Sequence, residues 1–289
     1  MEQETSPGRP GTGTLYVVAS PLGNLEDLSR RTERILRDVA VVAAEDTRRT
    51  RKLLSHLDAH PRLLSYHAYS GAGREDELLA SLEAGESVAV VTDAGTPAVS
   101  DPGGQIVARA REAGITIVPI PGPSAVVTAL SVSGLPADRF TFLGFPPRSG
   151  ADRRHVLAAV EKSPWTVVVF EAPTRLGRFL GDLVAMGMGA RQAAVARELT
   201  KIHEEIRAGT LEWLAGYYRD RTIRGEVTVV VAGAPAAVAE PLTAAEEEAI
   251  TARARELVQE GSSRRDVAAR LAKELNLSRN DAYRVVAAL

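Results

Sequence analysis

The feature of the sequence that most restricts its fold is a regular alternation of short apolar runs with longer amphipathic stretches. Runs rich in Val and Ile occur at 14–20, 39–44, 87–93 and 115–121, and helix-like patterns separate them at 28–38, 48–57, 74–84 and 102–113. Strands that are apolar on both faces and alternate with helices are typical of a parallel sheet covered by helices on both sides. We therefore expect an N-terminal α/β lobe over residues 14–121.

A second series of the same kind follows this lobe. Apolar runs near 140–144, 165–170, 193–196 and 226–232 alternate with helical patterns near 151–162, 174–187 and 210–219. The change from one series to the next falls near Pro121, within PIPGPSA. The sequence therefore predicts a C-terminal α/β lobe over 122–235, while residues 1–13 are expected to form a disordered tail.

The last part of the chain, residues 244–289, shows helical patterns alone. Ser263-x-x-Asp266 and Ser278-x-x-Asp281 look like helix starts with a capping side chain. Two short helices joined through ELNLS resemble a helix-turn-helix. Residues 264–284 contain six basic and three acidic side chains, so the module could contact nucleic acid. It could equally be a small packing module with a solvated face.

Composition excludes several classes of protein and site. The 289 residues include no cysteine, so a disulfide framework and a thiolate metal site are impossible, which is most easily reconciled with a reducing cytoplasm. The five histidines have no metal-ligand spacing, and we predict no metal. The N-terminus lacks a secretion signal, and no apolar run is long enough to span a membrane. A net charge of −2 means that any RNA binding must come from local basic patches.

Three Gly- and Pro-rich loops follow predicted strands: SPLGN (20–24), TDAGTP (92–97) and PGPSA (121–125). Ligands of open α/β sheets bind at the carboxyl ends of strands, although any one of these loops could be only a turn. Neither GxGxxG nor GxxxxGK[ST] is present. Asp101 before Pro102 is interpreted as the N-cap of the next helix, and Ser124 is placed in a first helical turn, where N–H groups can receive a carboxylate.

Eight segments in a fixed order make the chain resemble a known family. They are SPLGNLEDLSRR, AAEDTRRTRKLL, VTDAGTPAVSDPG, PIPGPSAV, FLGFPPR, VFEAPTRL, ARELTK and RGEVTVVVAG. Over about residues 14–233 the chain resembles the ribosomal RNA small subunit methyltransferase I family, which belongs to the tetrapyrrole-methylase fold group. The resemblance implies two α/β lobes of that type and a cofactor, S-adenosylmethionine, in the cleft between them.

The resemblance also implies an activity and a set of cofactor-binding residues. The activity is methyl transfer to the 2'-hydroxyl of a cytidine in the decoding region of small-subunit rRNA, with the rRNA or the 30S subunit as partner and a homodimer as the expected assembly. Gly95 is expected to allow the backbone to approach the cofactor, and Pro97 to fix the turn. The cofactor-binding residues by motif are Pro21, Asp93, Gly95, Thr96, Pro97, Ser124 and Ala125.

Transfer to a hydroxyl requires a proton acceptor, and a carboxylate is suited to that role. The candidates are Glu45, Asp46, Asp93 and Glu171. Glu45 and Asp46 come directly before a basic segment. This order favours a site in which one acid points into the cleft and the basic helix after it contacts phosphate. The alternative is an acidic helix start with a solvated basic face. Glu171 could instead pair with Arg175 across one helical turn.

RNA recognition is expected to depend on phosphate contacts, because aromatic residues make up only 4% of the chain and cannot form an extended stacking platform. The basic candidates are Arg48, Arg49, Arg51, Lys52, Arg148, Arg153 and Arg154, together with the C-terminal module. Two other functions stay open on the sequence. One is a methylase of the same fold with a tetrapyrrole or another non-RNA substrate, and the other is a non-catalytic RNA-binding protein.

Overall fold

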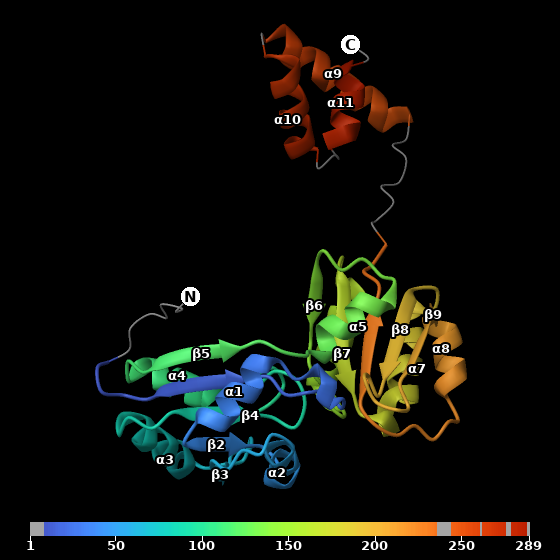
Figure 1. Cartoon of the computed structure of the whole chain (residues 1–289). Helices are drawn as coiled ribbons and strands as arrows, with labels where there is room; N and C mark the ends of the chain where they lie inside the picture. The colour runs from blue at the N-terminus through green and yellow to red at the C-terminus, as the bar shows by residue number, and fades with distance from the viewer. Residues whose placement is uncertain (1–8, 236–243, 261, 276–278, 288–289) are drawn as a thin grey trace. The chain divides into compact units, whose positions relative to one another are not determined.

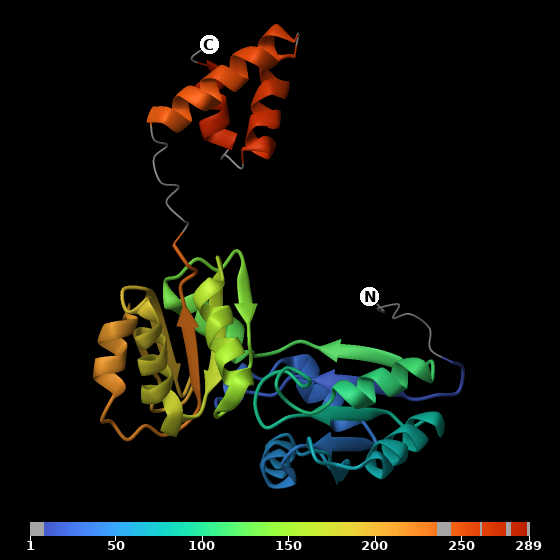
Figure 2. The ribbon, with the colours of Figure 1, turned by 180° about the vertical axis from the view of Figure 1, so that it is seen from behind.

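The computed structural model describes residues 9–235, 244–260, 262–275 and 279–287 (Figure 1). Contacts between residues divide the chain into two compact units, Met1–Ala234 and Pro235–Leu289. The first unit contains two sheets, each with its own helices, and Figure 2 shows the same arrangement from behind. No helix in the described ranges is long and apolar enough to cross a membrane.

The first sheet is parallel throughout and has the strand order β3-β2-β4-β1-β5. Its strands are β1 Thr14–Val18, β2 Val41–Ala44, β3 Arg62–Ser65, β4 Val88–Val91 and β5 Thr116–Ile120. Its helices are α1 Arg30–Asp38, α2 Thr47–His56, α3 Ala72–Glu83 and α4 Gly104–Glu112. Side chains of α1 and α2 pack on one face, and those of α3 and α4 on the other. The predicted parallel sheet with two covered faces is confirmed, and β3 is a strand that the sequence patterns did not indicate.

The second sheet is mixed and has the order β6-β7-β10-β8-β9. Its strands are β6 Phe140–Phe142, β7 Thr166–Glu171, β8 Gln192–Arg197, β9 Glu205–Thr210 and β10 Val227–Val231. Only β6 and β7 pair in parallel; β10 is antiparallel to both of its neighbours, and β8 and β9 form an antiparallel pair. The predicted second α/β lobe is confirmed, and its sheet differs from the first in being mixed. The short connection from β8 to β9 permits only antiparallel pairing.

Helices cover both faces of the second sheet. They are α5 Ala125–Ser133, α6 Gly150–Lys162, α7 Leu176–Leu183 and α8 Leu211–Tyr218. Residues of α5 pack on one face, and residues of α6, α7 and α8 on the other. The helix expected at 174–187 is divided into a 3₁₀ turn at Pro173–Arg175, α7, and a π-helical turn at Val184–Met188, in which Gly187 has a φ of 85°.

One buried side chain of the first lobe lies within the core of the second. Leu22, in the loop after β1, lies in the same apolar cluster as Val126 and Leu130 of α5 and Val168 of β7. Its exposed fraction is 6%. A loop of the first lobe therefore completes the core of the second, and this contact fixes the first loop against α5.

The second unit has an apolar core of its own. Helices α9 Ala244–Gln259, α10 Arg264–Glu274 and α11 Arg279–Ala287 bury side chains that include Leu257, Leu271 and Val286. The predicted helix start at Ser263 is confirmed, since its hydroxyl accepts the N–H of Asp266 at 3.2 Å. The second predicted cap, Ser278, lies outside the described residues.

Gly122, two residues after β5, offers a test of how closely the chain packs where β1 and β5 end. A Cβ at this position would lie 2.9 Å from the Cβ of Ala19, which follows β1. We expect Gly122→Ala to lower the free energy of unfolding by about 1 to 3 kcal/mol, because overpacked atoms must move apart. The control is Gly104→Ala, where nothing lies within 4 Å of the added Cβ. Urea unfolding of both variants measures the difference, and equal stability would contradict this packing.

Candidate active site

The loops that follow four neighbouring strands meet at one edge of the first sheet. Ser20, two residues after β1, and Gly95, four residues after β4, form a reciprocal backbone pair. The Ser20 N–H donates to the Gly95 carbonyl at 2.9 Å, and the Gly95 N–H donates to the Ser20 carbonyl at 3.0 Å. The Ser20 hydroxyl also donates to the Thr92 carbonyl at 2.9 Å. The two loops are therefore held together by their own backbones.

The loop after β4 has an unusual backbone conformation at several positions. Positive φ angles occur at Gly95 (80°), Ala98 (68°), Ser100 (64°) and Gly103 (129°). Alanine and serine rarely adopt this conformation, and such strain is concentrated at functional sites. At Gly95 the positive φ angle favours glycine, and its N–H and carbonyl are both bonded to Ser20. The expected approach of the cofactor to Gly95 stays a prediction.

The sequence indicated Asp101 as the N-cap of the following helix, and this prediction is wrong. Helix α4 starts at Gly104, and its N-cap is Gly103, which has no side chain to accept a hydrogen bond. Asp101 is instead a half-buried residue of the loop after β4. Burial, followed by the negative charges of Glu45 and Asp93, raises the pKa of Asp101 to about 7.

The carboxylates after β2 and β4 are joined by hydrogen bonds. The Asp93 N–H donates to Glu45 Oε2 at 3.2 Å, and the Asp46 N–H donates to Asp93 Oδ1 at 3.1 Å. Arg49 lies 3.4 Å from Asp93 Oδ2. Glu45, Asp93 and Asp101 together make this edge of the sheet acidic, which suits a positively charged ligand group.

Asp46 has a different environment from its neighbour Glu45. It is the N-cap of α2, where its side chain accepts the N–H of Arg48 at 2.8 Å, and it also pairs with the Arg48 guanidinium at 2.9 Å. The side-chain and backbone hydrogen bonds from Arg48 lower the pKa of Asp46 to about 2. A carboxylate this acidic is a weak proton acceptor.

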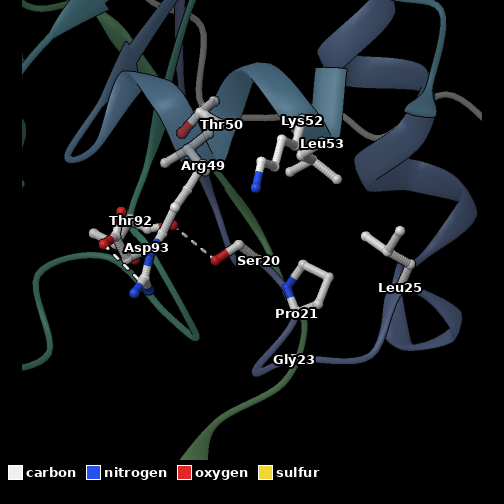
Figure 3. A pocket seen from close by; sticks show the side chains of 11 residues that line it. Ser20, Pro21, Gly23, Leu25, Arg49, Thr50, Lys52, Leu53, Thr92 and Asp93 are labelled. Atoms are coloured by element: carbon white, nitrogen blue, oxygen red, sulfur yellow. Dashed lines mark hydrogen bonds and ion pairs between the residues drawn. The ribbon is translucent and has the colours of Figure 1, made fainter. Parts of the chain in front are cut away.

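A pocket of about 280 Å³ opens beside these loops (Figure 3). Arg49, Lys52 and Leu53 of α2 lie across it from Pro21 and Leu25, and the Arg49–Asp93 pair closes one side. Of the predicted cofactor residues, Pro21 and Asp93 line this pocket. The other five do not line it: Gly95, Thr96, Pro97, Ser124 and Ala125.

Those five residues lie where the loop after β4 meets the second lobe. The Thr96 hydroxyl donates to the Pro123 carbonyl at 3.5 Å. Ser124 is the N-cap of α5, and its side chain makes no capping hydrogen bond; Ala125 is the first residue of that helix. The side chain of Ser124 is therefore available to a ligand at the junction of the lobes.

Glu171 lies in the interior of the second lobe. Its side chain is fully buried and pairs with Arg175 at 2.5 Å, and Arg153 lies 3.9 Å from its second oxygen. Burial raises the pKa of Glu171, against the opposing effect of the Ala172 N–H and the two arginines. The pairing of Glu171 with Arg175, which the sequence left open, is thus observed.

The predicted RNA-binding residues differ in their access to solvent. Arg48, Arg49, Arg51 and Lys52 are exposed on α2, and in the described part of the chain Arg51 and Lys52 form no ion pair. Arg148 and Arg154 are also exposed. Arg153 is 5% exposed and pairs with Asp182 at 2.6 Å, so its charge is neutralised inside the lobe and is not accessible to RNA.

Comparisons with known proteins agree with this architecture. Residues 14–215 match the family model of the tetrapyrrole (corrin/porphyrin) methylases. Among solved structures, a crystal structure of diphthine synthase has a TM-score of 0.62 at 19% identity, covering 76% of this chain and 90% of that one. Uroporphyrin-III-C-methyltransferase from Thermus thermophilus has a TM-score of 0.56 at 24% identity, covering 75% and 94%.

Relatives with higher sequence identity share one name, ribosomal RNA small subunit methyltransferase I. The protein from Synechocystis is 41% identical over 273 residues, which are 94% of this chain and 97% of the relative. The protein from Mycobacterium tuberculosis is 47% identical over 248 residues, which are 83% of this chain and 85% of the relative. The chain therefore belongs to the ribosomal RNA small subunit methyltransferase I family of the tetrapyrrole methylases.

Proposed function

We propose that this protein transfers the methyl group of S-adenosylmethionine to the 2'-hydroxyl of a cytidine in the decoding region of small-subunit rRNA. One observation carries the proposal. At one edge of the first sheet, the acidic residues Glu45 and Asp93 lie beside the exposed basic helix α2. Family membership supports an rRNA substrate. A homodimer acting on the 30S subunit in the cytoplasm is part of the same proposal.

The residues at the lobe junction suit this cofactor. S-adenosylmethionine supplies a methyl carbon on a positively charged sulfur, and the carboxylates of Glu45, Asp93 and Asp101 provide compensating negative charge. Pro21 and Asp93 would hold it from the first lobe, and Ser124 from the start of α5. The pair formed by Ser20 and Gly95 keeps these loops at a fixed separation, so the site is organised before the ligand binds.

Among the carboxyl groups at this edge of the sheet, Asp101 has a pKa that suits a proton acceptor for the attacking hydroxyl. A pKa near 7 leaves an appreciable fraction ionised at neutral pH while keeping the carboxylate basic. Asp46 is too acidic for this role, and Glu171 is paired in the interior of the second lobe. Glu45 contributes by accepting the Asp93 N–H and by raising the pKa of Asp101.

The basic residues of α2 would bind the phosphates next to the target ribose. Arg49 and Lys52 line the pocket, and Arg51 is exposed on the same helix. Arg49 also pairs with Asp93, so it connects the acidic cluster with the basic surface. Phosphate contacts of this kind set the register of the RNA without reading its sequence.

The main alternative is a methylase with a tetrapyrrole substrate, since structural neighbours include uroporphyrin-III-C-methyltransferase. Methyl incorporation from labelled S-adenosylmethionine should be compared for small subunits, naked rRNA and a porphyrinogen. We expect label in the ribose of one cytidine of the small subunit. Label only in the porphyrinogen would overturn the proposal in favour of the alternative.

A second prediction concerns the backbone of Gly95. A β-branched residue is strained at a φ of 80°, and its Cβ would contact Leu22 and the Pro123 carbonyl. We expect Gly95→Val to weaken S-adenosylmethionine binding by about tenfold or more, because a small misplacement of a binding loop has a large effect. Gly71→Val, at an exposed position with a φ of −70°, is the control. Calorimetry that finds equal dissociation constants for the two variants would remove Gly95 from the site.

A third prediction follows from the raised pKa of Asp101. The rate of methyl transfer should increase with pH up to about 7, as Asp101 loses its proton. Asp101→Asn should lose this increase and about two or more orders of magnitude in kcat. A variant that keeps the pH profile of the wild type would exclude Asp101 as the proton acceptor.

Stability gives an independent measure of the same group. Because folding raises the pKa of Asp101, the folded wild type binds the proton more tightly than the unfolded chain, and its stability falls as the pH rises from about 4 to about 7. Asparagine cannot ionise. Urea unfolding should therefore show Asp101→Asn close to the wild type near pH 4 and more stable than the wild type above pH 7.

A further inference from the structure

The pocket beside α2 continues into two further hollows. A hollow of about 650 Å³ shares Gly23 and Leu25 with the pocket and is otherwise lined by Asn24 and by the loop that includes Lys201 and Ile202. A third hollow, of about 520 Å³, shares His203 with the second. Because neighbouring hollows share lining residues, the three lie in a row from α2 of the first lobe to the edge strand β9 of the second, and we call this row the groove.

The far end of this groove, at β9 and α8, is rich in arginine. Its lining includes Arg197, Arg221 and Arg224 but only one acidic side chain, Glu205. Arg221 lies over the ring of Tyr217 at 4.0 Å from its centroid. Arg197 lies 3.7 Å from Glu205 and donates to the Arg224 carbonyl at 3.3 Å. The guanidinium groups of Arg197 and Arg221 are thus held in place, which favours phosphate binding, and the exposed Arg224 adds a third positive charge.

Arg221 and Arg224 carry charge that no acidic side chain in the described residues neutralises. Glu205 accepts instead from the Tyr218 hydroxyl at 2.8 Å and from Arg207 at 3.0 Å. Despite its burial, these hydrogen bonds lower the pKa of Glu205. The arginine end thus has an excess of positive charge in an otherwise slightly acidic protein.

The middle of the groove has a different character. Lys201 pairs with Glu198 at 2.8 Å and with Glu226 at 3.1 Å, so its charge is compensated locally. Ile202 is 98% exposed, and the adjacent His203 is exposed too. An apolar side chain and an imidazole beside neutralised charges can contact a base, whereas phosphate is favoured at the two basic ends.

We propose that single-stranded RNA lies along this groove, with phosphates bound at α2 and at Arg221 and Arg224, and with a base over Ile202. The proposal rests on the proposed function, because it takes RNA as the substrate, and it adds a second phosphate site on the other lobe. Basic sites on both lobes would hold the strand on either side of the target ribose. The strand would then be fixed at two points across the lobe junction.

Arg221→Ala combined with Arg224→Ala tests the far end of the groove. Fluorescence anisotropy with a single-stranded oligoribonucleotide should show binding weakened by about tenfold or more, and a slope of log K against log salt reduced by about 1.4 for two lost phosphate contacts. The KM for small subunits should rise similarly, with S-adenosylmethionine affinity unchanged. Arg139→Ala is the matched control, since Arg139 is exposed and precedes β6, the opposite edge of the same sheet.

Ile202 tests the middle of the groove without removing charge. The chain contains no cysteine, so Ile202→Cys provides a unique thiol for a photo-activated cross-linker. We expect it to cross-link to RNA, and the cross-link to disappear in the background of the two arginine substitutions. Lys162→Cys, exposed at the end of α6, should give no RNA cross-link.

The outcomes separate this proposal from the proposed function. If the wild-type protein binds RNA in the groove but transfers no methyl group, the proposed methyltransferase function is contradicted and the RNA-binding groove is supported. If methyl transfer is normal and the double arginine variant binds RNA as tightly as Arg139→Ala, the proposed RNA path along the groove is wrong, while the methyltransferase function is unaffected. If the arginine substitutions leave RNA binding unchanged and alter the oligomeric state by sedimentation, the surface is a protein interface and the proposal is wrong.

Discussion

The site depends on one reciprocal pair of backbone hydrogen bonds, between Ser20 and Gly95, at the ends of two neighbouring strands. This pair joins the loop after β1 to the loop after β4. Two residues beyond Ser20, the side chain of Leu22 is buried against α5 of the second lobe. The geometry of the first sheet is therefore transmitted to the second through a few short loops, and the candidate cofactor residues lie on these loops.

The same geometry produces the electrostatics of the site. Because β2 and β4 are adjacent and parallel, Glu45 and Asp93 emerge side by side, and the loop after β4 turns back to bring Asp101 close to both. A carboxyl group that is partly buried near two negative charges binds its proton more tightly. Ala98 and Ser100, which precede Asp101 in this loop, have the positive φ angles that are typical of functional loops.

Periodicity and loop chemistry predicted much of this architecture. The parallel sheet, its two covered faces and the loops SPLGN, TDAGTP and PGPSA at strand ends could be read directly from the sequence. The start of α5 near Ser124 was indicated, but the extent of the helix was not, because AVVTALSVS has no clear polar face. Strand β9 was missed because EIRAGT is a half-exposed edge strand. Arg153 is buried in a pair with Asp182, and the pKa of Asp101 is raised by Glu45 and Asp93. These partners are far apart in the sequence, so no local pattern predicts either contact.

The most direct test of the central claim is a crystal structure with S-adenosylhomocysteine bound. The account predicts that the ligand contacts the loops joined by Ser20 and Gly95, with its sulfur near the carboxylates of Asp93 and Asp101 and part of its surface against Ser124 at the start of α5. A ligand bound elsewhere on the chain, with these loops in contact only with one another, would contradict it.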